Sequence, residues 1–301
     1  MNRMMTVALV AMLSSACASP DRETQITVGL ASETEVPKEL DSFTIRVFRE
    51  RDNDLRFKQD YFPTSGRDFP TTLGVIPADE ESFDTPLRIE LEGRQGANTF
   101  LRRVAVVSYR RGKNVLLSMP LRMACFQFEG CGAGQTCAGG QCVPTAVNSD
   151  ALPEFQARTF FPTEGACFDE DQCLGASKVV TVEADCSFAL PAGVDLAAGN
   201  VSIRWAAAPS RILALEAEDA QEGWVRAGPT RGRLSQGACD SHFQKLGPNG
   251  KPLVADWAKE VLFSPTCASK RQSQPFCVSK TTLHAGIGAV FSSPEKSNGS
   301  K

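Results

Sequence analysis

Residues 125–143, which read CFQFEGCGAGQTCAGGQCV, are rich in cysteine and glycine, unlike the sequence before them. So short and glycine-rich a stretch cannot bury a core, so we expect two disulfides to hold it together. Its four cysteines allow three pairings. We favour the interleaved one found in small EGF-like modules, Cys125 with Cys137 and Cys131 with Cys142. We interpret the stretch as a disulfide-rich spacer between two domains rather than as a ligand or calcium site.

Cysteine usage differs on the two sides of this stretch. Residues 18–124 contain none, and six more follow it, at Cys167, Cys173, Cys186, Cys239, Cys267 and Cys277. With Cys17 set aside the count is even, which in an exported chain implies pairing. We expect Cys267 to close a short loop with Cys277, and Cys173 to pair with either Cys167 or Cys186. A cytosolic metal protein is disfavoured, because no C-x-x-C pair occurs and the chain has only two histidines.

Residues 1–16 have the layout of a secretory signal, with Arg3 ahead of the apolar run Met4–Leu13. That run of about ten residues is too short to span a bilayer, which takes roughly 20. Two cleavage sites remain open. Cleavage before Cys17 would leave this cysteine acylated, although Ser14 stands where a bulky aliphatic residue is usual. Cleavage after Ala18 would release a soluble protein.

Export follows from either cut, and we favour the lipid anchor on Cys17. The expected location is then the bacterial cell envelope, at the outer membrane, with the membrane as a partner through the acyl chains. The secreted, soluble protein is the alternative. The formal charge is -3, or -4 once Arg3 is removed, which is near neutral for this size. We therefore expect no nucleic-acid partner.

Within residues 24–124, the stretches 26–30, 43–47 and 87–91 alternate apolar and polar side chains with period two, which predicts strands with one buried face. Residues 104–109 are almost continuously apolar, which predicts a central strand covered on both faces. A basic group at Arg102, Arg103, Arg110 and Arg111 is interpreted as a solvated strand edge, with Glu90 and Glu92 as counter-charges. About seven short strands without a convincing helix are typical of an immunoglobulin-like or prealbumin-like β-sandwich. The candidate strands are 26–30, 43–47, 55–61, 72–76, 87–91, 104–109 and 115–121.

The composition of residues 144–154 predicts a linker, and residues 155–291 predict a second β-rich domain stapled by three disulfides. Residues 212–217 and 257–263 fit either a strand or a short helix. The polar residues 292–301 predict a disordered tail. The clearer strands of this second domain are 179–182, 188–190, 201–205 and 224–227.

Few side chains suggest chemistry. Asp169 and Asp171 lie in an acidic loop and are weak candidates for calcium, which takes six to eight oxygens, but the EF-hand spacing is absent. His242 follows Asp240 and Ser241, yet neighbours in sequence seldom form a triad. No G-x-S-x-G elbow and no phosphate-binding glycine loop occur, and we expect no cofactor.

The neighbouring residues predict whether two of the three tryptophan side chains are buried or exposed. Trp205 shares a face with Val201 and Ile203, which favours the core. Trp224 follows a turn at Gly223, and we expect it to be exposed, as a weak candidate for contact with a glycan or peptide. Trp257 is left unassigned.

The arrangement as a whole resembles a loose group of cysteine-rich surface lipoproteins of myxobacterial type. The similar pieces are the signal with Cys17 and residues 36–42, 134–143, 167–173 and 185–187. The resemblance implies location and architecture, and it implies no activity.

Three functions are compatible with these observations. The leading hypothesis is a non-enzymatic lipoprotein that binds or scaffolds a surface protein or glycan through loops on a rigid β framework. A secreted hydrolase would use Asp169, Asp171 or His242. A glycan-binding module would need an exposed aromatic residue such as Trp224.

Overall fold

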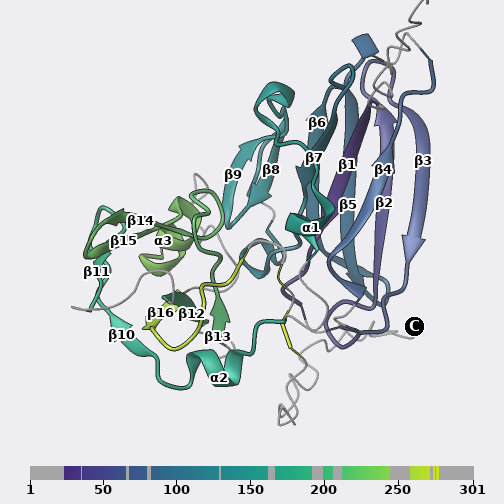
Figure 1. Ribbon diagram of the computed structural model, residues 1–301. Helices are drawn as coiled ribbons and strands as arrows, with labels where there is room; N and C mark the ends of the chain where they lie inside the picture. Colours follow the sequence, from purple (N-terminus) through teal and green to yellow (C-terminus); the bar gives the residue numbers. More distant parts are fainter. Residues whose placement is uncertain are drawn as a thin grey trace, which may run out of the picture.

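The computed structural model describes residues 24–277, apart from 35, 66–67, 80–82, 129, 162–166, 192–198, 206–211, 245–257, 272–273 and 275. The fold is mainly β and carries five disulfides. Two lobes are visible in Figure 1, with a small two-stranded unit beside the first. We call the lobes the N-terminal lobe (β1–β7) and the C-terminal lobe (β10–β16). The small unit is the disulfide module (residues 123–144). Cys17, Trp257 and His284 lie outside the described residues.

The N-terminal lobe consists of two sheets, with the strand orders β4-β1-β7 and β3-β2-β5-β6. Strand β1 pairs with β4 antiparallel and with β7 parallel, while the second sheet is antiparallel throughout. Each expected strand of this region overlaps one of the seven. The prediction of a central strand at 104–109 is wrong, because these residues belong to β6 and the turn after it, and β6 is the outermost strand of its sheet. They are β1 (Gln25–Leu30), β2 (Ser42–Arg49), β3 (Asp54–Tyr61), β4 (Thr71–Val75), β5 (Leu87–Gln95), β6 (Asn98–Val107) and β7 (Asn114–Ser118).

The two sheets share one apolar core. Ile26 and Val28 of β1 and Ile45, Ile89 and Leu91 of the other sheet are all buried in it. Period-two alternation produces this arrangement, because every second side chain of a strand faces the same way.

The stretch predicted to be a linker is bonded to the N-terminal lobe. Val106 of β6 donates its N–H to the Thr145 carbonyl (2.7 Å) and accepts from the N–H of Val147 (2.9 Å). Farther along, Leu116 of β7 donates to the Pro153 carbonyl at 2.8 Å. Since β6 and β7 are the outermost strands of their sheets on this side, the stretch satisfies backbone groups that would otherwise form open edges.

The disulfide module contains the 3₁₀-helix η3 (Met123–Cys125) and the hairpin of β8 (Gln135–Ala138) and β9 (Gln141–Pro144). The interleaved pairing of Cys125 with Cys137 and of Cys131 with Cys142 is confirmed. The hydroxyl of Thr136 accepts a hydrogen bond from the N–H of Val104 at 2.9 Å, which fixes the hairpin against β6.

The C-terminal lobe has sheets of order β10-β16-β12-β13 and β11-β15-β14. Both stretches that the sequence left open between helix and strand contain strands, β13 and β16. The strands are β10 (Lys178–Val180), β11 (Ser187–Ala189), β12 (Asn200–Trp205), β13 (Ile212–Ala214), β14 (Trp224–Gly228), β15 (Arg231–Leu234) and β16 (Ala258–Ser264). The short helices are η4 (Ser149–Ala151), α1 (Ala157–Phe160), α2 (Glu170–Leu174) and α3 (Gln236–His242).

The predicted short disulfide loops of this lobe are wrong. Cys167 pairs with Cys277, Cys173 with Cys267 and Cys186 with Cys239, across 110, 94 and 53 residues. The three bridges are nested one inside another. The lobe brings its own ends together: Cys277 donates its N–H to the Phe168 carbonyl at 2.9 Å, and Phe168 and Phe276 form a parallel bridge. The spacing of the cysteines along the sequence does not indicate these long-range pairings.

The module and the C-terminal lobe touch backbone to backbone at glycines. Gly139 lies in the β8–β9 turn at φ +56°, in the left-handed region that favours glycine. A Cβ on Gly237 of α3 would overlap the carbonyl oxygen of Gly139, and a Cβ on Gly139 would come within 2.8 Å of the Glu222 Cα. The predicted spacer is therefore wedged tightly against the second lobe.

Substitution of Gly237 tests this contact. Gly237→Ala should lower the free energy of unfolding by about 1–3 kcal/mol, as overpacking does in other tight sites. The measurement is urea denaturation of the oxidised protein. Gly228→Ala is the matched control, because a Cβ there meets nothing within 4 Å. Equal stability of the two variants would contradict a tight contact between Gly237 and Gly139.

Candidate functional site

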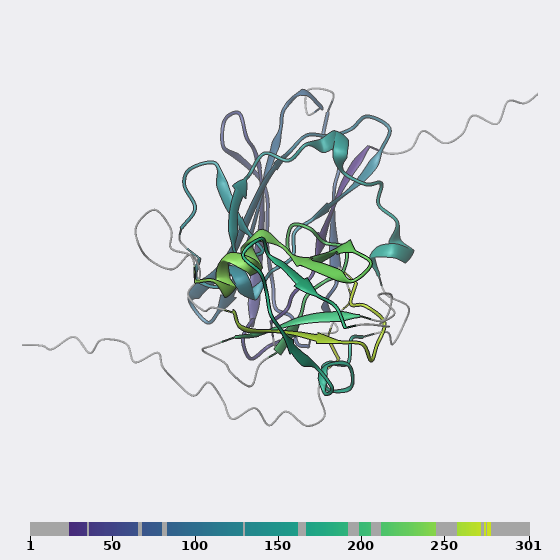
Figure 2. The ribbon, with the colours of Figure 1, turned by 90° about the vertical axis from the view of Figure 1, so that its left-hand side faces the viewer.

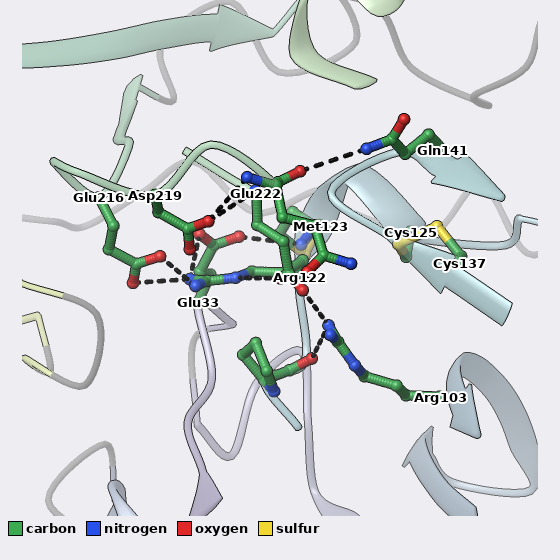
Figure 3. Close-up of polar contacts among 12 residues, drawn as sticks. Glu33, Arg103, Arg122, Met123, Cys125, Cys137, Gln141, Glu216, Asp219 and Glu222 are labelled. Carbon is green, nitrogen blue, oxygen red and sulfur yellow. Dashed lines mark hydrogen bonds and ion pairs between the residues drawn. A yellow bond between two sulfur atoms is a disulfide. The ribbon is translucent and has the colours of Figure 1, made fainter. Parts of the chain in front are cut away.

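The chief polar feature of the described fold is a buried ion cluster where the lobes meet (Figure 3). At its centre is Arg122, which precedes η3 and is only 3% exposed. Its Nη1 donates to Glu33 at 2.9 Å and to Glu216 at 2.7 Å, and its Nε donates to Glu222 at 2.9 Å. Nη2 makes a further short contact with Glu216. One guanidinium thus holds carboxylates from both lobes.

Two more cations complete the cluster. Lys270 donates to Glu216 Oε1 at 2.7 Å, and Arg103 of β6 forms an ion pair with Glu222 Oε1. Three cations therefore face three carboxylates, Glu33, Glu216 and Glu222. Charges removed from water are costly unless they are paired and hydrogen-bonded, and this balance meets that requirement.

A tight loop between β13 and β14 positions two of the acids. Asp219 Oδ1 accepts hydrogen bonds from the backbone N–H groups of Gln221 (3.0 Å) and Glu222 (2.9 Å). The N–H of Trp224 donates to the Glu216 carbonyl at 3.0 Å. A Cβ on Gly223 would overlap that carbonyl, so glycine is required there. The loop is thereby folded so that Glu216 and Glu222 both face Arg122.

The surroundings shift the pKa values of these groups. Burial alone would raise the pKa of Glu216, but the charges and hydrogen bonds of Arg122 and Lys270 lower it to about 2. Burial opposes the charge on Arg122, yet Glu216, Glu33 and Glu222 raise its pKa well above the ordinary value. Burial and the nearby charge of Glu222 raise the pKa of Asp219. Glu216 and Arg122 are thus both held in their charged forms, which suits a structural contact between the lobes better than proton transfer.

Sequence reasoning missed this cluster. The expectation of a solvated edge is wrong for Arg103, because its side chain is largely buried beside Glu222. For Arg102 the expectation is confirmed: it is exposed and lies 3.7 Å from Glu90. The partners of Arg122 are 89 to 100 residues away in sequence. The only local signal is an arginine placed directly after the apolar stretch that ends at Leu121.

One of the two metal candidates, Asp169, has a structural role. The Asp169 carboxylate accepts the N–H of Gln172 at 2.9 Å and so caps α2, the helix that also carries Asp171. Within the described residues, no group of three or more His, Cys, Asp or Glu side chains is arranged to hold a metal ion.

The residues around His242 anchor α3 to β16. The ring Nδ1 lies 3.0 Å from the Ala258 carbonyl oxygen, and the Ser241 hydroxyl accepts from the Ala258 N–H at 3.0 Å. Asp240 instead accepts from the side chain of Gln236 at 2.7 Å. These contacts point Ser241 and His242 at the same backbone segment rather than at each other, so they give no support to a catalytic triad.

The expected exposure of Trp224 is wrong. Its side chain is 2% exposed and lies against Phe188, with the ring centroids 6.3 Å apart. Trp224 pairs across the strands with Leu234, which is also buried, so both side chains lie in the core although the preceding turn suggested otherwise. The core position expected for Trp205 is confirmed.

A groove of about 1040 Å³ lies between the outer face of β5 and β6 and the disulfide module. Its floor carries Glu90, which has Arg46, Arg88 and Arg102 within 3.9 Å. Its far wall includes Phe126, Phe128 and the turn around Gly134. Charged, amide and aromatic groups therefore line the same hollow.

Comparisons with known proteins identify no relative of this chain. The chain matches no protein-family model, and no curated protein or solved structure is significantly similar to it. Among the described residues, no helix has the length and apolar character needed to cross a bilayer.

Removal of the central cation should destabilise the fold strongly. Arg122→Met leaves Glu216 and Glu222 buried beside fewer cations, and breaking such a pair costs about 3–5 kcal/mol. Chemical denaturation with a tryptophan fluorescence readout measures the loss. The control is Arg56→Met, which removes an exposed pair with Asp54 (3.0 Å) worth about 0–1 kcal/mol. Similar losses in both variants would contradict the importance of the cluster.

Acid should weaken the protein through Glu216. Because folding lowers the pKa of this group from 4.5 to about 2, its contribution is complete above about pH 4.5 and is lost as the pH falls towards 2. Asp219 opposes this trend, since a raised pKa favours folding at low pH and the benefit is lost as the pH rises. In urea denaturation at pH 6, 4.5 and 3, the free energy of unfolding should fall less with acid for Glu216→Gln than for the wild type. An identical slope would refute the assignment.

Proposed function

We propose that the protein is an exported, lipid-anchored protein of the bacterial cell envelope that binds or scaffolds a partner without catalysing a reaction. The signal-like leader and the paired cysteines support export, since five disulfides suit an oxidising compartment. The small residues Ser15 and Ala16 ahead of Cys17 support the anchor on this cysteine. Membership in the cysteine-rich surface lipoproteins of myxobacterial type, which the chain resembles, is part of the same proposal. The outer membrane is the proposed location.

The same proposal assigns architecture to the parts. The two sheets around a shared core support an immunoglobulin-like or prealbumin-like sandwich for the N-terminal lobe. The interleaved cysteine pairs support an EGF-like module. A rigid β framework of this kind carries recognition in its loops and grooves.

The groove beside the disulfide module is the observation that carries the binding role. Its volume, about 1040 Å³, is slightly larger than the 300–1000 Å³ typical of ligand sites. Its walls are fixed by two disulfides on one side and by the sheet on the other, so little order has to be gained on binding. Its mixture of charged, amide and aromatic side chains suits an envelope protein or a glycan.

Photo-crosslinking in intact cells tests the binding role. A benzophenone amino acid placed at Thr99, an exposed residue of the groove, should form a covalent adduct with the partner. The same amino acid at Gln59, an exposed residue of β3 outside the groove, is the control. Adducts at neither position, or equally at both, would contradict a binding role of the groove.

Intact mass of the protein from the membrane fraction tests the anchor. The expected chain begins at an acylated Cys17, and it takes up no alkylating reagent before reduction because ten cysteines are paired. A chain that begins at Ser19 without lipid would refute the anchor. Alkylation before reduction would refute complete pairing.

A further inference from the structure

The chain enters the fold beside one loop of the N-terminal lobe. Thr24 Oγ1 accepts a hydrogen bond from the N–H of Gly112 at 2.8 Å, and Gln25 donates its N–H to the Lys113 carbonyl at 3.0 Å. The start of β1 is thus fixed to the loop of residues 108–113, which connects β6 to β7.

The distance from Cys17 to this point has a fixed upper limit. Seven residues, 18–24, lead from Cys17 to the end of Thr24, and a chain cannot extend farther than about 3.6 Å per residue. The tether therefore reaches about 25 Å at most. From Thr24 to Glu33, along β1 to the ion cluster, the lobe spans about 30 Å of extended chain. A lobe longer than its tether cannot turn upside down on the surface that holds Cys17.

The surface around this entry point has one exposed apolar side chain and two partly exposed basic ones. Ile76 is 64% exposed and directly follows Val75, which pairs with Ile26 at the start of β1. Arg110 and Lys113 lie in the adjoining loop. Their partners Asp150 and Glu154 are exposed, at 3.1 and 3.5 Å, and pairs of that kind are weak enough to exchange for lipid phosphates.

The C-terminal lobe is attached at the other end. Ser32 forms a bridge with Leu121 beyond the far ends of β1 and β7, and Glu33 and Arg122 follow in the ion cluster. Figures 1 and 2 show the C-terminal lobe beside one end of the N-terminal lobe. Because the ion cluster and the glycine contact fix the two lobes, their orientations relative to a membrane are linked.

We propose that the end of the N-terminal lobe formed by residues 108–113 and Ile76 lies against the lipid bilayer, and that the C-terminal lobe faces away from it. This inference rests on the proposed acylation of Cys17. Ile76 reaches the level of the acyl chains, while Arg110 and Lys113 contact headgroup phosphates.

Hydrogen exchange of the full mature protein tests the orientation. The acylated protein is incorporated into vesicles of phosphatidylethanolamine and phosphatidylglycerol, and amide exchange is followed by mass spectrometry. Residues 76–79 and 108–113 should exchange several-fold more slowly than in a variant with twenty Gly and Ser residues inserted between Ala18 and Ser19. The β14–β15 turn at residues 228–231 should exchange equally in both proteins.

The outcomes separate the two proposals. Acylated protein with no difference at residues 76–79 and 108–113, or with protection at 228–231 instead, would overturn the orientation and leave the anchor standing. Protein whose intact mass shows no acyl chains would overturn both. Because the insertion precedes the first described residue, loss of protection in that variant reports the tether length rather than unfolding.

Discussion

The guanidinium of Arg122 is the interaction on which the arrangement of this molecule depends. It lies between two apolar cores and pairs with acids from both lobes. In other proteins, replacing such a set with apolar side chains can be neutral or stabilising, whereas removing one partner leaves an uncompensated buried charge and is strongly destabilising. Carboxylates left without Arg122 would oppose any other docking of the lobes.

The surrounding backbone supports this geometry. The loop that carries Glu216 and Glu222 is closed by its own hydrogen bonds, and Gly223 admits a turn that a side chain would block. Next to it, Gly139 of the disulfide module contacts the same loop and Gly237 of α3. Charge pairing and close backbone packing thus coincide at the junction of the two lobes and the disulfide module.

The sequence predicted local structure well and long-range structure poorly. Alternation in residues 26–30 and 87–91 gave the strands of the N-terminal lobe, because period two is a direct consequence of strand geometry. The interleaved pairs of Cys125 and Cys131 were also accessible, because this pairing is the one found in small EGF-like modules. Tertiary contacts between residues far apart in sequence determine the pairing of Cys167 with Cys277 and the burial of Arg103. Local sequence patterns do not contain that information. Trp224 shows the same limit, because a nearby turn does not determine which face of the next strand is buried.

The nested disulfides give the C-terminal lobe a particular response to cutting. Any single backbone break between residues 187 and 238 lies inside all three bridges, and a break elsewhere from 168 to 276 lies inside at least one. Both pieces then stay covalently joined, and the free energy lost is that of a new pair of chain ends rather than of a missing fragment. In a compartment where proteases act and chaperones are few, such a lobe would keep its surface after being nicked.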